Sequence, residues 1–169
     1  MKMRFAVIIF LIAFLLQGTL LNLFSIFGAT PNLVLCLVII FSFLYEDNNG
    51  LVLGVVFGLL MDLCFTPYMG MNAFAMLIVS LFVSFLRENI NKENLVPVLT
   101  VSVVATFIFN LIYFFLSRCF GSTYSIIYWL KLQPLFVIYN LVVVFILYLI
   151  LIKRVVKYRN DRYLIWKKY

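Results

Sequence analysis

The sequence predicts an all-α polytopic membrane protein with about six transmembrane helices, and three observations predict it. Of the 169 residues, 66% are hydrophobic and 11% are charged, and the mean hydropathy is +1.17. Soluble domains are nearer half apolar and a quarter charged, so a water-soluble fold could not bury this much apolar surface. Six apolar segments follow one another between short breaks, and most basic residues lie where six spans would put them on one side of a membrane. We expect one six-helix transmembrane domain over residues 1–152 and a basic amphipathic tail over residues 153–169.

Turn and loop signals divide the chain into these segments. Proline in the first turn of a helix costs little, which favours helix starts near Pro31, Pro97 and Pro134. The other breaks are polar or glycine-containing stretches, namely residues 46–49 (EDNN), 66–70 (TPYMG) and 87–94 (RENINKEN). The six expected spans are residues 5–27, 33–45, 50–65, 71–86, 95–116 and 134–152.

The first segment and the last connection each raise a separate question. Lys2 and Arg4 precede an apolar run that is too long for the core of an ordinary signal peptide, and no A-x-A-like site closes it. We therefore expect a retained first span. Residues 117–131 form the longest connection, and they include Tyr124, Tyr128 and Trp129, whose rings prefer the level of the lipid headgroups. We expect an interfacial or re-entrant helix in this connection.

The distribution of lysine and arginine predicts the orientation of the chain. Six spans with both termini in the cytoplasm place eleven basic residues inside and two, Arg118 and Lys131, outside, in agreement with the positive-inside rule. The tail carries most of the net charge of +7. We expect an interfacial helix there, acting either as a topology anchor on anionic lipid or as a docking site for a cytoplasmic partner, and no nucleic-acid site. The tail residues expected to make these contacts are Lys153, Arg154, Lys157, Arg159, Arg162, Trp166, Lys167 and Lys168.

Residues 50–62, GLVLGVVFGLLMD, place a glycine at every fourth position and an aspartate at the next such step. Four residues turn a helix by about 400°, so Gly50, Gly54, Gly58 and Asp62 lie close to one face. Lipid offers no hydrophobic gain for helix pairing, and small residues at this spacing permit the close backbone approach that stabilises it. We expect a helix-packing groove on this face, filled either within the chain or by another subunit.

Asp62 is the one formal charge clearly inside an apolar segment. An ionised carboxylate at depth is costly unless it is paired, so Asp62 should face the bundle interior or a watery cavity. Twelve residues of helix rise about 18 Å, which places Asp62 past the midplane toward the outer side. We expect either a structural aspartate that pins the TPYMG turn or a proton or ligand site. Hydrogen-bond donors could come from the backbone of that turn or from Gln17, Asn72, Asn110 and Asn140.

The side chains available limit the chemistry. The chain has no histidine, which removes Ser-His and Cys-His nucleophile pairs and imidazole metal sites. Cys36, Cys64 and Cys119 are scattered and form no CxxC motif, so they indicate neither a disulfide framework nor a metal site. A lone carboxylate gives no acid–base pair. We therefore expect no catalytic residues, no metal and no cofactor.

The motifs of residues 28–75 resemble those of the MreD family of bacterial rod-shape-determining membrane proteins. The resemblance rests on Pro31-Asn32-Leu33, an acidic loop, the glycine series, Asp62 and the downstream Gly70. It implies helix-packing or partner-binding roles for Gly50, Gly54, Gly58 and Asp62, and a turn motif at Pro31, Asn32 and Gly70. Some members of the family have an acid where Asn32 stands.

The resemblance also implies a function and a fold. Such proteins are non-catalytic subunits of the elongation complex of the bacterial inner membrane, which directs lateral peptidoglycan synthesis. Their partner is the bitopic protein MreC, and they connect indirectly to MreB filaments and wall synthases. Their fold is similar to that of the substrate-binding subunits of energy-coupling-factor vitamin transporters. A vitamin-binding subunit is the alternative function, although the AxxxA-type face of such subunits is missing because Ala6 and Ala13 are seven residues apart.

Overall fold

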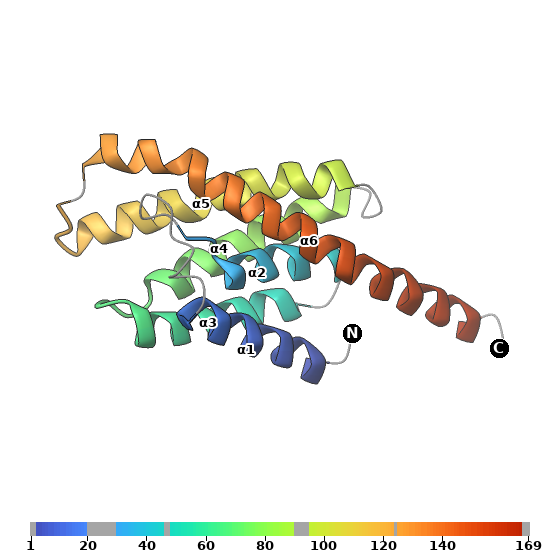
Figure 1. Ribbon diagram of the computed structural model, residues 1–169. Coiled ribbons are helices and arrows are strands. Elements are labelled where there is room, and N and C mark those ends of the chain that lie inside the picture. Colours follow the sequence, from blue (N-terminus) through green and yellow to red (C-terminus); the bar gives the residue numbers. More distant parts are fainter. Residues whose placement is uncertain (1–2, 20–29, 46–47, 90–94, 124, 167–169) are drawn as a thin grey trace.

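The computed structural model describes residues 3–19, 30–45, 48–89, 95–123 and 125–166, with the backbone alone for residues 89 and 153–166. Within these ranges the protein is all-helical, as the sequence predicts, and its helices form one bundle (Figure 1). A short 3-10 helix, η2 (Arg87–Asn89), follows the fourth α-helix. The α-helices are α1 (Met3–Thr19), α2 (Leu33–Leu44), α3 (Asn49–Phe65), α4 (Met71–Leu86), α5 (Leu95–Cys119) and α6 (Ile126–Trp166).

Helix α2 forms the centre of the bundle. Its sequence, LVLCLVIIFSFL, is apolar on every side, and a helix of this kind is expected to be buried on every side. Eleven of its twelve residues are buried, and it contacts each of the other five α-helices. Because its neighbours cover it, α2 need not span a bilayer by itself, and its twelve residues extend only about 18 Å.

The helix ends gather at two ends of the bundle. Figure 1 shows the start of α1 and the last turns of α6 at one end, and the turns that follow α3 and α5 at the other. We call the second one the turn end. Because the helices alternate in direction, the C-termini of α1 and α3 and the N-termini of α2 and α4 all lie at the turn end. The unpaired backbone groups of four helix termini therefore meet in one region of the protein.

At the opposite end, Arg87 connects the end of α4 to the end of α2. Its Nη1 donates hydrogen bonds to the carbonyl oxygens of Ser42, at 3.2 Å, and of Tyr45. The last carbonyls of a helix lack partners within the helix and carry partial negative charge. A guanidinium from the neighbouring helix therefore closes the C-terminus of α2.

Two of the helices are long and apolar enough to cross a membrane by length and composition. These are α5 and the part of α6 from Ile126 to Ile152. Helices α1 to α4 are apolar but have 12 to 17 residues each. At about 1.5 Å per residue, 17 residues extend about 26 Å, which is slightly less than the roughly 30 Å of a hydrocarbon core. Six complete spans therefore stay a prediction.

The connection between the last two helices is shorter than the sequence predicts. The separate interfacial or re-entrant helix expected over residues 117–131 is wrong, because α5 continues to Cys119 and α6 begins at Ile126 and continues past Pro134. Tyr124 lies outside the described residues, and the interfacial position of Tyr128 and Trp129 stays a prediction. Gly121 ends α5 in the left-handed conformation, with φ at +86°. The backbone N–H of Ser122 bonds to the carbonyl of Ser117 at 3.0 Å, a pattern typical of helix C-termini that glycine closes.

Pro134 does not begin the sixth helix, since it lies two turns inside α6. The turns before it are held against α5 by Trp129, whose ring centre lies 5.1 Å from that of Phe114 and 6.0 Å from that of Phe107. Pro134 itself is exposed on the outside of the bundle. Tertiary packing therefore extends the helix beyond the position at which proline would favour its start.

The tail is continuous with α6. The sequence predicts a separate interfacial helix after Ile152, but the backbone remains helical to Trp166 without a break. Residues 153–166 contain no glycine or proline that would end a helix. Of the tail residues predicted to contact lipid or a partner, those from Lys153 to Trp166 are described by their backbone alone, and Lys167 and Lys168 lie outside the described residues, so their roles stay predictions.

Candidate functional site

The glycine face of α3 is filled from within the chain. A β-carbon on Gly50 would lie 2.6 Å from the backbone nitrogen of Ser42 in α2, and one on Gly58 would lie 2.7 Å from the Cα of Ala73 in α4. At Gly54 the nearest atoms are side-chain methyls of Val38, at 3.1 and 3.2 Å. The glycine spacing left open whether this face packs within the chain or against another subunit, and in the structure it packs against α2 and α4 of the same chain. A partner helix would have to bind a different face of the bundle.

Asp62 is 1% exposed, and both of its carboxylate oxygens accept hydrogen bonds from the start of α4. Oδ1 accepts from the backbone N–H of Asn72 at 3.0 Å and from its side-chain amide at 2.9 Å. Oδ2 accepts from the backbone N–H groups of Gly70 at 3.0 Å and of Ala73 at 3.2 Å. The hydroxyl of Thr66 lies 3.1 Å from Oδ1 and completes the set.

Asp62 thus serves as the N-terminal cap of a helix other than its own. The N-cap residue of α4 is Gly70, which has φ at +94° and no side chain to accept a hydrogen bond. Three backbone donors at this terminus are satisfied by the carboxylate from α3 instead. The positive end of the α4 dipole also compensates the negative charge without a lysine or arginine. A carboxylate has about four lone-pair sites, and the four N–H donors of Gly70, Asn72 and Ala73 are enough to occupy them.

A second polar cluster caps α2 at the turn end. Asn32 is the N-cap residue, and its Oδ1 accepts from the backbone N–H of Leu35 at 2.9 Å. Gln17 of α1 donates to the same oxygen at 3.4 Å and accepts from the backbone N–H of Val34 at 3.2 Å. Asn140 of α6 accepts from the backbone N–H of Asn32 at 2.9 Å. This cluster ties the first, second and sixth helices together.

The structure separates side chains that the sequence grouped as donors to Asp62, namely Gln17, Asn72, Asn110 and Asn140. Of these, Asn72 bonds to Asp62. Gln17 and Asn140 belong to the Asn32 cluster, and Asn110 donates to Gln133 at 3.0 Å. These four residues can be found in the sequence because they are polar side chains in or beside apolar segments. The sequence does not show which of them form hydrogen bonds with one another or with Asp62. Pro31 is buried immediately before Asn32, and the turn that it was expected to form extends into residues outside the described ranges.

Replacing Asn32 with alanine should destabilise the start of α2. Loss of an N-cap side chain costs about 0.5–2 kcal/mol, and the change also removes the acceptor for Gln17. Thermal unfolding of the purified protein in mild detergent, followed by circular dichroism, measures the loss. Asn32→Asp is the matched control, because it keeps the capping oxygen and should unfold close to wild type. Equal midpoints for Asn32→Ala and wild type would contradict the capping role.

The fold and these clusters define a class of protein: a strongly apolar, all-helical bundle in which buried polar side chains cap the starts of α2 and α4, and in which α5 and α6 are long enough to cross a membrane. Among the described residues, no group of three or more histidine, cysteine, aspartate or glutamate side chains could hold a metal ion. The buried carboxylate of Asp62 bonds to the backbone at the start of its neighbouring helix. These hydrogen bonds from α3 to the start of α4 stabilise the packing of the two helices in the bundle.

The chain belongs to the MreD family, because it matches the family model described as rod shape-determining protein MreD over residues 1–157. The resemblance seen in residues 28–75 is thereby confirmed, and the match covers α1 to α5 and most of α6. MreD is a family of shape-determining membrane proteins and not a known enzyme family. No curated protein and no solved structure gave a significant match. The likeness to transporter substrate-binding subunits stays a prediction.

Proposed function

We propose that this protein is a non-catalytic subunit of the bacterial elongation complex, which directs lateral peptidoglycan synthesis. The observation that carries the proposal is the family match over residues 1–157. In this proposal the chain crosses the inner membrane six times, with both termini in the cytoplasm. It binds an MreC-like bitopic protein and connects indirectly to MreB-like filaments and wall synthases. The start of α1 and the end of α6 lie at one end of the bundle, which supports an even number of passes (Figure 1).

The internal contacts support a scaffold role. The carboxylate of Asp62 joins α3 to the start of α4. The cluster around Asn32 joins α1 and α6 to the start of α2. Buried polar groups of this kind are costly to leave unpaired, which favours one arrangement of the helices. The glycine face is occupied by α2 and α4, so the proposed partner contact lies on an outward face of the bundle.

The proposed partner is tested by affinity purification of the tagged full chain from mild detergent, followed by mass spectrometry. We expect a bitopic protein with a coiled-coil segment to be recovered with it. An unrelated polytopic membrane protein with the same tag and the same expression level is the control for nonspecific recovery. Failure to recover any bitopic protein above this control would contradict the partner assignment.

The proposed role in cell shape is tested by depletion in a rod-shaped host. Cells should widen and become spherical as the protein is lost, because lateral wall growth would no longer be directed. Cell width and the incorporation pattern of a fluorescent wall precursor measure the effect. Re-expression of the wild-type chain should restore both. Rods of normal width with an unchanged pattern of wall growth would contradict the proposal.

A further inference from the structure

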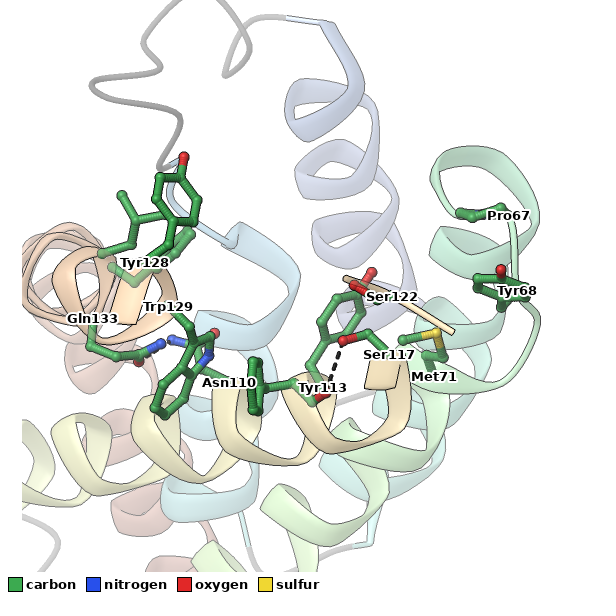
Figure 2. A pocket seen from close by; sticks show the side chains of 13 residues that line it. Pro67, Tyr68, Met71, Asn110, Tyr113, Ser117, Ser122, Tyr128, Trp129 and Gln133 are labelled. Carbon is green, nitrogen blue, oxygen red and sulfur yellow. Dashed lines mark hydrogen bonds between the residues drawn. The ribbon is translucent and has the colours of Figure 1, made fainter. Parts of the chain in front are cut away.

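A cavity of about 450 Å³ lies at the turn end, between α5, the start of α6 and the turn that follows α3 (Figure 2). Its wall is mainly aromatic and apolar, with rings from Tyr68, Phe114, Trp129 and Phe136. Every residue that the structure places in the lining is uncharged. Sites for small molecules typically have volumes of roughly 300–1,000 Å³, an apolar wall and a few polar groups. An uncharged or amphipathic group would fit this cavity best.

Gln133 provides an unused hydrogen-bond donor at the cavity. The residue is 6% exposed, and its Oε1 accepts from the side-chain amide of Asn110 at 3.0 Å. Figure 2 shows the two amides facing one another between α5 and α6. Its Nε2 is buried and has no hydrogen-bond partner within the described part of the chain. A buried donor without an acceptor is costly, and more so where water is scarce, so a bound molecule with an acceptor oxygen would be stabilised here.

A cation lies beside the cavity without lining it. Arg118 is exposed, and its guanidinium carbon lies 5.7 Å from the centre of the Phe114 ring. It also contacts the carbonyl oxygen of Ser122 at 3.5 Å, and both Phe114 and Ser122 line the cavity. A molecule whose uncharged part occupied the cavity could therefore place an anionic group against Arg118. Arginine pairs well with phosphate.

We propose that this cavity binds a glycerophospholipid of the surrounding membrane. The ester carbonyl accepts a hydrogen bond from Gln133 Nε2, the first part of an acyl chain packs against Trp129 and Phe136, and the phosphate pairs with Arg118. A membrane lipid is the favoured occupant because, within the described ranges, α5 and α6 are the helices long and apolar enough to cross a bilayer. Trp129 in the lining also prefers the depth at which headgroups and acyl chains join. This assignment does not depend on the proposed function.

The test reconstitutes the full chain in phosphatidylethanolamine vesicles that contain phosphatidylglycerol with a photoreactive group near the ester. Crosslinked peptides are mapped by mass spectrometry, and those carrying residues 110–117 and 128–136 should be labelled. Gln133→Met keeps the length of the side chain and removes the donor, so labelling should fall about tenfold. Thr106→Val is the matched control, because the Thr106 hydroxyl is also buried and has no partner among the residues that the structure describes, but it does not line the cavity. Unchanged labelling in Gln133→Met, or an equal fall in Thr106→Val, overturns the proposal.

Two further variants separate the parts of the lipid. Arg118→Gln should lower labelling by phosphatidylglycerol several-fold and leave labelling by a photoreactive diacylglycerol unchanged, since the latter has no phosphate. Ser117→Phe fills the cavity and should lower labelling by both probes, which keeps the test valid if Gln133→Met fails to fold. Recovery of a water-soluble molecule that blocks labelling, or labelling spread evenly over the helices, overturns the assignment to phospholipid.

Discussion

Replacing Asp62 with alanine should destabilise the protein by several kcal/mol and should lower the amount of inserted protein. The change leaves the backbone N–H groups of Gly70, Asn72 and Ala73 without their acceptor in a buried region. Hydrogen bonds to charged groups contribute about 1.5–3 kcal/mol each, and removing a buried charge recovers part of this sum. We expect a net loss of about 3–5 kcal/mol in the free energy of unfolding.

Two further variants rank the contributions of the Asp62 cap. Asp62→Asn keeps one acceptor oxygen, but its NH2 group would face backbone donors, so the loss should be intermediate. Thr66→Val removes a single donor at the partly exposed edge of the cap and should cost about 1 kcal/mol. Unfolding in mild detergent, monitored by circular dichroism, gives the order. If Asp62→Ala unfolds like wild type, the carboxylate is not a structural cap, and a proton or ligand role becomes the better explanation.

The boundaries of the central helices could be predicted because each has a local cause. The span predicted at residues 71–86 is the helix α4, and those predicted at 33–45 and 50–65 differ from α2 and α3 by one residue. Proline, glycine and polar residues at these breaks act on their own neighbours, through fixed φ, left-handed φ or side-chain caps. Local chemistry of this kind is visible in the sequence.

The capping of α2 by side chains of α1 and α6 could not be predicted. Asn140 lies 108 positions from Asn32, and Gln17 lies 15 positions from it, so their pairing depends on how the bundle packs. The same reason explains the early start of α6, where the packing of Trp129 on α5 outweighs the local preference of Pro134. The glycine spacing likewise predicted that one face of α3 packs closely against a neighbouring helix, but it did not predict that α2 and α4 are the neighbours.

The three glycines of that face should respond unequally to alanine. At Gly58 the new methyl would meet the backbone of Ala73 at 2.7 and 2.9 Å, and at Gly50 it would meet the backbone of Ser42. Backbone cannot rotate aside, so overpacking should cost about 1–3 kcal/mol. At Gly54 the contact is with the methyls of Val38 at 3.1 and 3.2 Å, so a side chain would have to shift by a few tenths of an ångström, which is less than the backbone contacts require. Alanine also favours the helix by about 1 kcal/mol, so Gly54→Ala should be close to neutral.

Gly58→Ala should be the most destabilising of the three, because its contact coincides with the Asp62 cap. The methyl would push on Ala73, whose N–H bonds to Asp62 Oδ2 at 3.2 Å, so overpacking and loss of the cap should occur together. The two costs should then be non-additive: Gly58→Ala should destabilise an Asp62→Ala background less than it destabilises wild type. Gly50→Ala, which contacts α2 far from the cap, serves as the control and should be additive with Asp62→Ala. Additive costs for both pairs would mean that α4 can yield at Ala73 without releasing the carboxylate.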